Sequence, residues 1–229
     1  MDAVVMAAGE GRRLRPLTER WPKPVLPIDG RPVLATLLWE LAAAGISRVF
    51  LVTGHLAEQV EWLAGDGSAF GLEVRTVRQP GVLGSADAVQ RAARAGAAPP
   101  FVVSAADTLY SRGDVGRFAD AYREAGAAGA IAVRRDPPVE PGRPGIRIRN
   151  DLVELIGDDA SPLSAAPLWA LDEPVVSRLC LDREPYELEN AFRAAMNAGA
   201  RIAGIEIGKT HDLTYPLDLV EENFPYLLA

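Results

Sequence analysis

Along the first two thirds of the chain, segments with the hydrophobic pattern of a strand alternate with segments with the hydrophobic pattern of a helix. Runs rich in β-branched residues predict strands over residues 3–6, 48–53, 73–78, 101–104 and 130–134. Between them, apolar residues at helical spacing predict helices over residues 32–44, 56–63, 85–94 and 114–125. This alternation predicts an α/β fold, with a doubly wound, mostly parallel, Rossmann-like sheet and helices on both faces.

The pattern changes after Asp136. Prolines at positions 137, 138, 141 and 144 predict a loop, and residues 145–156 predict two short strands, with 167–171 as a further candidate strand. A helix over 187–198, a strand over 201–207 and a helix over 216–226 complete the pattern. We expect a single domain over residues 1–229, with a small β-rich insertion near residues 137–171.

Composition and charge narrow the classes of function. The 229 residues are 48% hydrophobic and 24% charged, which is typical of a globular protein with a real core. Acidic residues outnumber basic ones by 31 to 24, and the net charge of -7 argues against nucleic acid and anionic membranes as partners. Cys180 is the single cysteine, and no run approaches the ~20 apolar residues of a membrane span. We expect a soluble, cytoplasmic protein.

Lysine is rare in this chain. Of the 24 basic residues, only Lys23 and Lys209 are lysines. A compact ammonium and a broad guanidinium are not interchangeable, so these two positions are candidates for sites where arginine does not serve.

The strongest chemical signal directly follows the first predicted strand, in the run Ala7-Ala8-Gly9-Glu10-Gly11-Arg12-Arg13-Leu14. Small residues at the carboxyl end of a strand let backbone N–H groups approach a phosphate closely. The two glycines alone also fit an ordinary tight turn, and a dinucleotide-binding motif would need a third glycine that this run lacks. In the following Pro22-Lys23-Pro24, two prolines restrict the backbone around the ammonium, although a solvated loop charge is the alternative.

The segment from Ala7 to Leu34 resembles the signature of the sugar nucleotidyltransferase family. It contains, in order, Gly-x-Gly-x-Arg-Leu, Pro16-Leu17-Thr18, Pro22-Lys23-Pro24 and Pro27-Ile28-Asp29-Gly30-Arg31-Pro32. Later stretches are similar to further family motifs, namely Gln79-Pro80 with Gly84-Ser85-Ala86, Ala106-Asp107, Tyr186-Glu187-Leu188, and Asp212 to Pro216. The resemblance covers nearly the whole chain and points to the short branches that include N-acetylmuramate 1-phosphate uridylyltransferases and glucose-1-phosphate thymidylyltransferases.

This resemblance implies an enzyme that joins a nucleoside triphosphate to a sugar 1-phosphate and releases pyrophosphate. It implies a nucleotide-binding loop at Ala7, Ala8, Gly9 and Gly11, with Arg13 on the triphosphate and Lys23 near the α-phosphate as the catalytic cations. Asp107 and Asp212 would hold the implied cofactor, Mg2+, through hard carboxylate oxygens. Taken alone, either aspartate could instead cap a turn or a helix.

Base recognition is implied at Gln79 and Gly84. The amide of Gln79 offers one donor and one acceptor face, which matches the imide edge of uracil or thymine, so UTP or dTTP is favoured. Gly84 would leave room for the base, because it has no side chain. The alternative is that Gln79 is an exposed residue before a Pro-Gly turn. In this reading residues 1–136 bind the nucleotide, and residues 137–229 close the site and bind the acceptor.

The acceptor end departs from the family pattern. Larger members carry a Glu-Lys-Pro whose lysine meets the sugar phosphate, and the corresponding residues 155–160 contain no lysine here. Glu187 and Lys209 are the candidate acceptor-binding residues, with Lys209 as a substitute for the missing charge. The departure leaves open a CTP-dependent transferase that acts on a phosphorylated alcohol such as choline phosphate or an inositol phosphate.

Two other classes of protein fit less well. A non-catalytic regulator that binds nucleotide sugars would be expected to have lost Arg13, Lys23, Asp107 or Asp212, and all four are present. A nicotinamide dehydrogenase would need the third glycine and an acidic residue at the end of the second strand.

Three further residues are expected to be structural. Trp39 and Trp62 fall at apolar spacing on predicted helices and are expected in the core, while Ser85 is expected to cap the helix that begins there.

Overall fold

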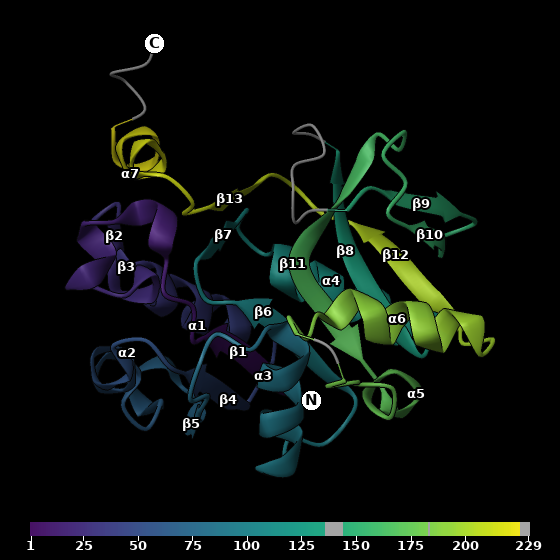
Figure 1. The fold of residues 1–229 in the computed structure, drawn as a ribbon, viewed down its shortest axis with the longest axis horizontal. Helices are drawn as coiled ribbons and strands as arrows, with labels where there is room; N and C mark the ends of the chain where they lie inside the picture. Colours follow the sequence, from purple (N-terminus) through teal and green to yellow (C-terminus); the bar gives the residue numbers. More distant parts are fainter. Residues whose placement is uncertain (136–143, 183, 225–229) are drawn as a thin grey trace.

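A mixed β-sheet runs through the centre of the computed structural model, which describes residues 1–135, 144–182 and 184–224. Within these residues the sheet has nine strands in the spatial order β5-β4-β1-β6-β11-β8-β12-β10-β9 (Figure 1). Its strands in chain order are β1 (Asp2–Ala7), β4 (Arg48–Thr53), β5 (Glu73–Arg78), β6 (Phe101–Ala105), β8 (Gly129–Arg135), β9 (Ile146–Arg149), β10 (Leu152–Ile156), β11 (Leu163–Leu171) and β12 (Ile202–Glu206). Two small antiparallel sheets accompany it, formed by β2 (Pro27–Ile28) with β3 (Arg31–Pro32) and by β7 (Thr108–Tyr110) with β13 (Thr210–Asp212).

Helices cover both faces of the sheet, as the alternating pattern predicts. They are α1 (Val33–Ala43), α2 (Ala57–Ala64), α3 (Ser85–Arg94), α4 (Asp114–Ala125), α5 (Glu173–Val176), α6 (Leu188–Asn197) and α7 (Pro216–Asn223). Neighbouring residues of β1 point to opposite faces: Val5 belongs to the core under α1 and α4, and Val4 to the core under α3 and α6. No helix of the described residues is long and apolar enough to cross a membrane.

The α/β class is confirmed, but the second half of the sheet differs from the prediction. Strand β11 lies between β6 and β8 and runs antiparallel to both, so residues 163–171 belong to the centre of the main sheet rather than to an insertion. Parallel pairing is restricted to β5-β4-β1-β6 and to β8 with β12. Strands β9 and β10 extend the far edge of the same sheet. The β11 run is rich in alanine and poor in β-branched residues, which weakens its strand signal.

The expectation that Trp39 and Trp62 lie in the core is wrong, because their side chains are 46% and 86% exposed. Helix α1 carries apolar residues on nearly every side, and Leu34, Leu38 and Leu41 take the buried face. Periodicity alone could not decide which apolar residues of α1 face inward. The proline-rich loop over 136–143 and the last residues of the predicted final helix lie outside the described residues.

The sheet topology sets the position of the site. Strands β1 and β6 are parallel neighbours, so their carboxyl ends lie at one edge of the sheet. The Gly9–Gly11 turn follows β1, and Asp107 follows β6. Ligands of open α/β sheets bind in this position, outside the carboxyl ends of the strands.

Candidate active site

The loop that follows β1 folds into three short 3-10 turns, at Arg12–Leu14, Leu17–Glu19 and Lys23–Val25. Its apolar residues Leu14 and Leu26 are buried in a small cluster with Ile28, Val33 and Leu213. Leu213 comes from the far end of the chain and directly follows Asp212. One apolar cluster therefore fixes both the phosphate-binding candidate loop and the segment that carries Asp212.

The Lys23 side chain passes so close to residue 11 that only a glycine fits there. Its φ of +62° is a left-handed conformation that favours glycine. A Cβ at this position would lie 2.9 Å from Cγ of Lys23 and 2.8 Å from Cγ2 of Thr18, closer than such contacts allow. The second glycine of the motif therefore lets the loop close over the lysine.

The Lys23 ammonium pairs with Asp107. Its Nζ lies 2.8 Å from Oδ2 of Asp107, across 84 positions of sequence. The two side chains are 15% and 27% exposed, so the pair is partly shielded from water and still reachable. The structure thus joins two residues that the sequence predicts as catalytic and metal-binding.

Asp212 reaches the same place through the pairing of β7 with β13. Asp212 stands opposite Thr108 in this ladder, and Oγ1 of Thr108 donates a hydrogen bond of 2.6 Å to Oδ1 of Asp212. The backbone N–H of Leu213 donates to the carbonyl oxygen of Asp107 at 3.1 Å. These bonds bring the two aspartates, which are far apart in sequence, to one side of one cavity.

Arg134 is a site residue that sequence reasoning missed. It comes from β8, is 2% exposed, and its Nη2 lies 3.9 Å from Oδ2 of Asp212. Its Nη1 donates to the carbonyl oxygen of Thr210 at 2.9 Å and also to the Thr210 hydroxyl. A buried arginine in a hydrophobic strand was the available signal, since such a charge is rarely buried without a partner.

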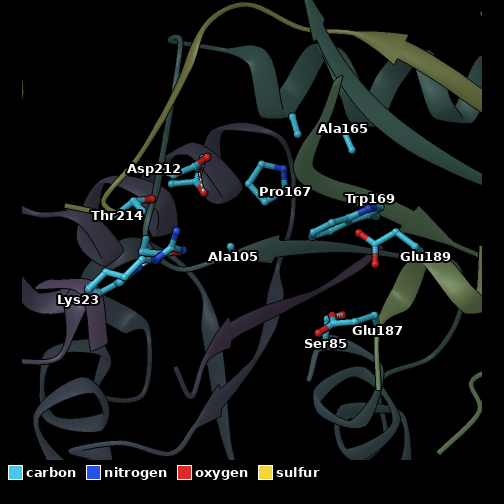
Figure 2. A pocket seen from close by; sticks show the side chains of 14 residues that line it. Lys23, Ser85, Ala105, Ala165, Pro167, Trp169, Glu187, Glu189, Asp212 and Thr214 are labelled. Carbon is cyan, nitrogen blue, oxygen red and sulfur yellow. Dashed lines mark hydrogen bonds and ion pairs between the residues drawn. The ribbon is translucent and has the colours of Figure 1, made fainter. Parts of the chain in front are cut away.

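These groups line a cavity of about 240 Å³ (Figure 2). The lining residues are Arg13, Lys23, Ser85, Ala105, Asp107, Thr108, Ala165, Ala166, Pro167, Trp169, Glu187, Glu189, Asp212 and Thr214. Figure 2 shows Lys23, Asp212 and Thr214 on one side of the cavity and Trp169, Glu187, Glu189 and Ser85 on the other. The cavity therefore has one side where carboxylates lie beside cations, and another side that carries carboxylates and an aromatic ring.

We call Glu187, Glu189 and Trp169 the acidic wall. Oε2 of Glu187 accepts a hydrogen bond of 2.5 Å from the Ser85 hydroxyl. Burial raises the pKa of the Glu189 carboxyl, and the nearby charge of Glu187 raises it further. Trp169 is 7% exposed and lies in β11, a strand that the sequence did not place in the central sheet. Neither Trp169 nor Glu189 was predicted as a site residue.

Ser85 caps a helix other than the one it begins. Its Oγ accepts a hydrogen bond of 2.9 Å from the backbone N–H of Leu188, at the start of α6. The expected cap on α3 is therefore wrong, since Gly84 is the residue before α3 and no side chain bonds to that helix end. The hydroxyl instead ties α6, and with it Glu187, to the loop before α3.

Gln79 is buried rather than exposed, with 5% of its surface accessible. Its Nε2 donates to Oδ2 of Asp87 at 2.7 Å and to the carbonyl oxygen of Gly84 at 3.2 Å. Both partners are acceptors, so the nitrogen of the amide must face them. The role of Gln79 in base recognition stays a prediction, with its amide orientation now fixed.

Gly84 has a structural reason to lack a side chain. Its φ is +101°, and a Cβ there would lie 2.4 Å from the backbone oxygen of Tyr186. The backbones of residues 83–86 and Tyr186 are hydrogen-bonded on both sides of this contact. The close approach to Tyr186 explains the glycine without a nucleobase, so its contact with a base also stays a prediction.

The structure does not bring Lys209 to the cavity. Its side chain is exposed and is absent from the lining, and its carbonyl oxygen accepts a hydrogen bond of 3.0 Å from Ser111. Strand β13 begins only after this residue, at Thr210, and of its residues Asp212 lines the cavity. The hypothesis that Lys209 replaces the missing lysine is therefore not supported, and Arg134 is the additional cation close to Asp212.

Arg13 projects from the loop toward the final segment of the chain. Its guanidinium carbon lies 5.4 Å above the centre of the Tyr215 ring, which is a cation–π contact. Arg13 also lines the cavity, although its side chain is largely exposed. The contact holds this exposed guanidinium at the mouth of the site.

Tyr110 anchors Pro167, one of the residues that line the cavity. Its hydroxyl donates to the carbonyl oxygen of Pro167 at 2.8 Å and lies 2.9 Å from Oγ of Ser104. Burial raises the pKa of Tyr110 far above its usual range, and the charges of Asp212 and Asp107 add to that shift. Tyr110 is thus a neutral structural donor rather than a general base.

The donor set fits Mg2+. Asp107 and Asp212 offer carboxylate oxygens, the ligands that Mg2+ prefers, and Mg2+ is commonly held by one or two carboxylates together with substrate phosphates. No cluster of three or more His, Cys, Asp or Glu side chains suited to a metal occurs among the described residues. The two aspartates would therefore suit a cation that is completed by phosphate oxygens.

Comparisons with known proteins agree with this geometry. The family described as Nucleotidyl transferase matches residues 2–145. Glucose-1-phosphate thymidylyltransferase of Streptomyces griseus is 33% identical over 237 residues, which cover 97% of this chain and 65% of the relative. N-acetylmuramate alpha-1-phosphate uridylyltransferase of Neisseria meningitidis serogroup B is 36% identical over 110 residues, which cover 48% of each chain. The matches thus span about half to two thirds of the length of these relatives.

The fold also recurs in solved structures. The inositol-1-phosphate CTP transferase from T. maritima superimposes with a TM-score of 0.80 at 20% sequence identity, covering 95% of this chain and 90% of the other. At this identity the likeness concerns the fold alone.

Proposed function

Because the chain belongs to the nucleotidyl transferase family, we propose that it is an enzyme that joins a nucleoside triphosphate to a sugar 1-phosphate, releasing pyrophosphate. UTP or dTTP is the favoured nucleotide, and Mg2+ is the cofactor. The observation that carries the proposal is the meeting of Arg13, Lys23, Asp107 and Asp212 in one cavity at the edge of the sheet. Two cations and two hard carboxylates are what a reaction between highly charged phosphates requires.

The reaction needs positioning and charge more than proton transfer. An oxygen of the acceptor phosphate attacks the α-phosphorus, a new P–O bond forms, and the bond to the β-phosphate oxygen breaks, so that pyrophosphate leaves with its electron pair. Holding both reactants in line supplies a large part of the rate. Held by Asp107 and Asp212, Mg2+ would neutralise phosphate charge.

We assign to Lys23 the role of stabilising charge at the α-phosphate. Its ammonium has three donors, so it can keep its bond to Asp107 and still reach a phosphate oxygen in the cavity. Arg13 offers a planar guanidinium at the mouth, suited to bidentate contact with the outer phosphates. The backbone of Ala8, Gly9 and Gly11 follows the end of β1 and would present N–H groups to the same phosphates.

The amide of Gln79 can accept a hydrogen bond from a base. Since its nitrogen faces Asp87 and Gly84, only its oxygen is left to accept a hydrogen bond. Uracil and thymine can donate to this oxygen from a ring N–H, and cytosine can donate from its 4-amino group. UTP or dTTP is therefore favoured by the relatives, a thymidylyltransferase and a uridylyltransferase, and not by the orientation of this amide.

A second candidate is a CTP-dependent transferase that acts on a phosphorylated alcohol. Two observations favour it: residues 155–160 contain no lysine, and the fold is shared with an inositol-1-phosphate CTP transferase. It ranks second because a thymidylyltransferase matches 97% of this chain and a uridylyltransferase matches 48% of it.

Pyrophosphate release tests both candidates. The purified protein would be assayed with Mg2+ against the five common nucleoside triphosphates, each crossed with a panel of sugar 1-phosphates and alcohol phosphates. We expect release with UTP or dTTP and a sugar 1-phosphate, and its loss in Asp107→Asn. Release only with CTP and an alcohol phosphate would select the second candidate. Nucleotide binding without any release would instead favour a non-catalytic regulator.

A further inference from the structure

Among the described residues, neither carboxylate of the acidic wall forms an ion pair. Glu187 is bonded to a neutral hydroxyl, that of Ser85, at 2.5 Å. Glu189 is half-buried, and the charge of Glu187 acts on it unfavourably. Figure 2 shows both carboxylates on the side of the cavity opposite Lys23 and Asp212, with Glu189 next to the Trp169 ring and Glu187 next to Ser85. The part of a ligand that enters this side meets negative charge and an aromatic surface.

The cations of the cavity lie elsewhere. Among the residues described as lining it, the basic side chains are Lys23, which pairs with Asp107, and Arg13, which lies over Tyr215. Arg193 attracts Glu189 from outside the lining, but its guanidinium donates to Oδ1 of Asn190 and to the carbonyl oxygen of Ile156. The phosphate of an acceptor therefore belongs with Lys23, and the organic part carried by that phosphate belongs at the acidic wall.

Charge decides what this organic part is. Two carboxylates that a ligand shields from water are costly unless hydrogen bonds and positive charge compensate for the lost hydration. A neutral polyol supplies hydrogen bonds alone, and a second anionic group adds repulsion. An ammonium supplies both donors and charge, and a tryptophan ring is the aromatic surface that attracts a cation most strongly.

We propose that the acceptor phosphate of this protein carries an ammonium group, held between Glu187 and Glu189 against the Trp169 ring. The proposal rests on the function proposed above, since it names the substrate class of the same site. An amino sugar 1-phosphate and an amino alcohol phosphate share this chemistry. An acceptor with an additional carboxylate is rejected, because its charge would face the acidic wall.

Matched pairs of acceptors test the proposal. With the nucleotide that gives the fastest release, kcat/KM would be compared for glucosamine 1-phosphate against glucose 1-phosphate, and for phosphoethanolamine against ethylene glycol phosphate. We expect the amine of at least one pair to be preferred by about tenfold or more, the scale of a charge-assisted hydrogen bond. The pair with the larger preference identifies the source of the amine. Equal or better use of the neutral member in both pairs overturns the proposal, while the proposed transfer reaction stands.

Binding measurements distinguish a failure of the proposed transfer reaction from a failure of the proposed ammonium site. If no acceptor releases pyrophosphate, the proposed function fails, and calorimetric binding of glucosamine 1-phosphate and glucose 1-phosphate decides the charge preference by itself. Tighter binding of the amine supports the acidic wall as its site. Equal affinities overturn it.

Substitutions in the acidic wall test whether its carboxylates cause the preference for an amine acceptor. Glu187→Gln and Glu189→Gln keep the shape of each side chain and remove its charge, so we expect the ratio of kcat/KM between amine and neutral acceptor to fall toward one. Glu184→Gln is the matched control, because it makes the same charge change at an exposed residue outside the lining. An amine preference that survives both wall substitutions, or that Glu184→Gln removes equally, contradicts the proposal.

Discussion

Both sides of the cavity carry carboxylates, but the partners of these carboxylates differ between the two sides. On one side, which we call the paired side, each carboxylate has a cation: Lys23 at 2.8 Å from Asp107 and Arg134 at 3.9 Å from Asp212. On the acidic wall, Glu187 is bonded to a hydroxyl and Glu189 is opposed by its neighbour. The ion pairs orient the carboxylates of the paired side, as phosphate chemistry needs. The wall is complete only when a ligand compensates for its charge.

Removal of Lys23 is the strongest way to break this contrast. Lys23→Ala takes away the cation at the α-phosphate and leaves Asp107 with less compensation, so we expect kcat to fall by about a hundred- to a thousandfold. Lys23→Arg is not expected to restore it, because a guanidinium is broader than an ammonium and the path beside Gly11 is narrow. Steady-state pyrophosphate release measures both.

Lys209→Ala is the matched control for Lys23, since it removes the other lysine of the chain at an exposed site outside the cavity. We expect the KM for the acceptor to stay within error of the parent value. A comparable loss of kcat in both alanine variants would show that general charge, not the cavity, sets the rate.

Substitution of Arg134 should destabilise the paired side, because Arg134 is its buried cation. Arg134→Met keeps an unbranched apolar side chain but removes a buried cation beside Asp212, so we expect the free energy of unfolding to fall by about 3 kcal/mol. Urea denaturation measures this change. Arg135→Met serves as the control, because Arg135 is exposed and pairs with Glu206 at the surface. A similar effect of both variants would argue against a special role for the buried charge.

Thr108→Val tests how Asp212 is oriented. The variant removes the donor that lies 2.6 Å from Oδ1 of Asp212 and preserves the shape of the side chain. We expect the Mg2+ concentration for half-maximal activity to rise roughly tenfold, the usual cost of losing a partner of a metal ligand. A lower kcat at saturating Mg2+ with an unchanged Mg2+ requirement would instead indicate a general packing defect.

The smallest expected effect is a gain in stability at the acidic wall. The pKa of Glu189 is raised in the folded protein because burial and the charge of Glu187 disfavour the ionised form. A raised pKa means that folding favours the protonated carboxyl, and that this contribution is lost as the pH rises through the folded pKa. Glu189→Gln should therefore unfold at a higher temperature than the parent at pH 8, with the difference shrinking at pH 4. An equal shift at both pH values would show that charge is not the cause.

The first half of the fold was accessible from sequence because local signals agree there. The predicted helix over 114–125 matches α4, and the strands over 48–53 and 73–78 match β4 and β5. In these segments β-branched residues, helical periodicity and bounding glycines point to the same element. For β11 the sequence predicts a candidate strand only over residues 167–171, because the whole segment lacks β-branched residues and its strand signal is weak. Its place between β6 and β8 is decided by long-range pairing.

The site residues also fall into those that the sequence could identify and those that it could not. Motifs identify Lys23, Asp107 and Asp212, and the structure gathers all three in one cavity. Arg134 and Trp169 could not be found in this way, because each is an isolated side chain on a strand whose neighbours are unknown until the sheet is assembled. Lys209 shows the opposite error, since closeness to Asp212 in sequence did not bring its side chain to the site.

The central position of β11 has a consequence for how the chain folds. Strands β6 and β8 are complete by Arg135, but the strand that separates them spans Leu163–Leu171. Until β11 is in place, both neighbours present an unpaired edge, the kind of surface that pairs with another chain. Intermediates that lack β11 should therefore be the most prone to aggregate. Because Trp169 arrives with this strand, its fluorescence should report on the same step that closes the sheet and completes the acidic wall.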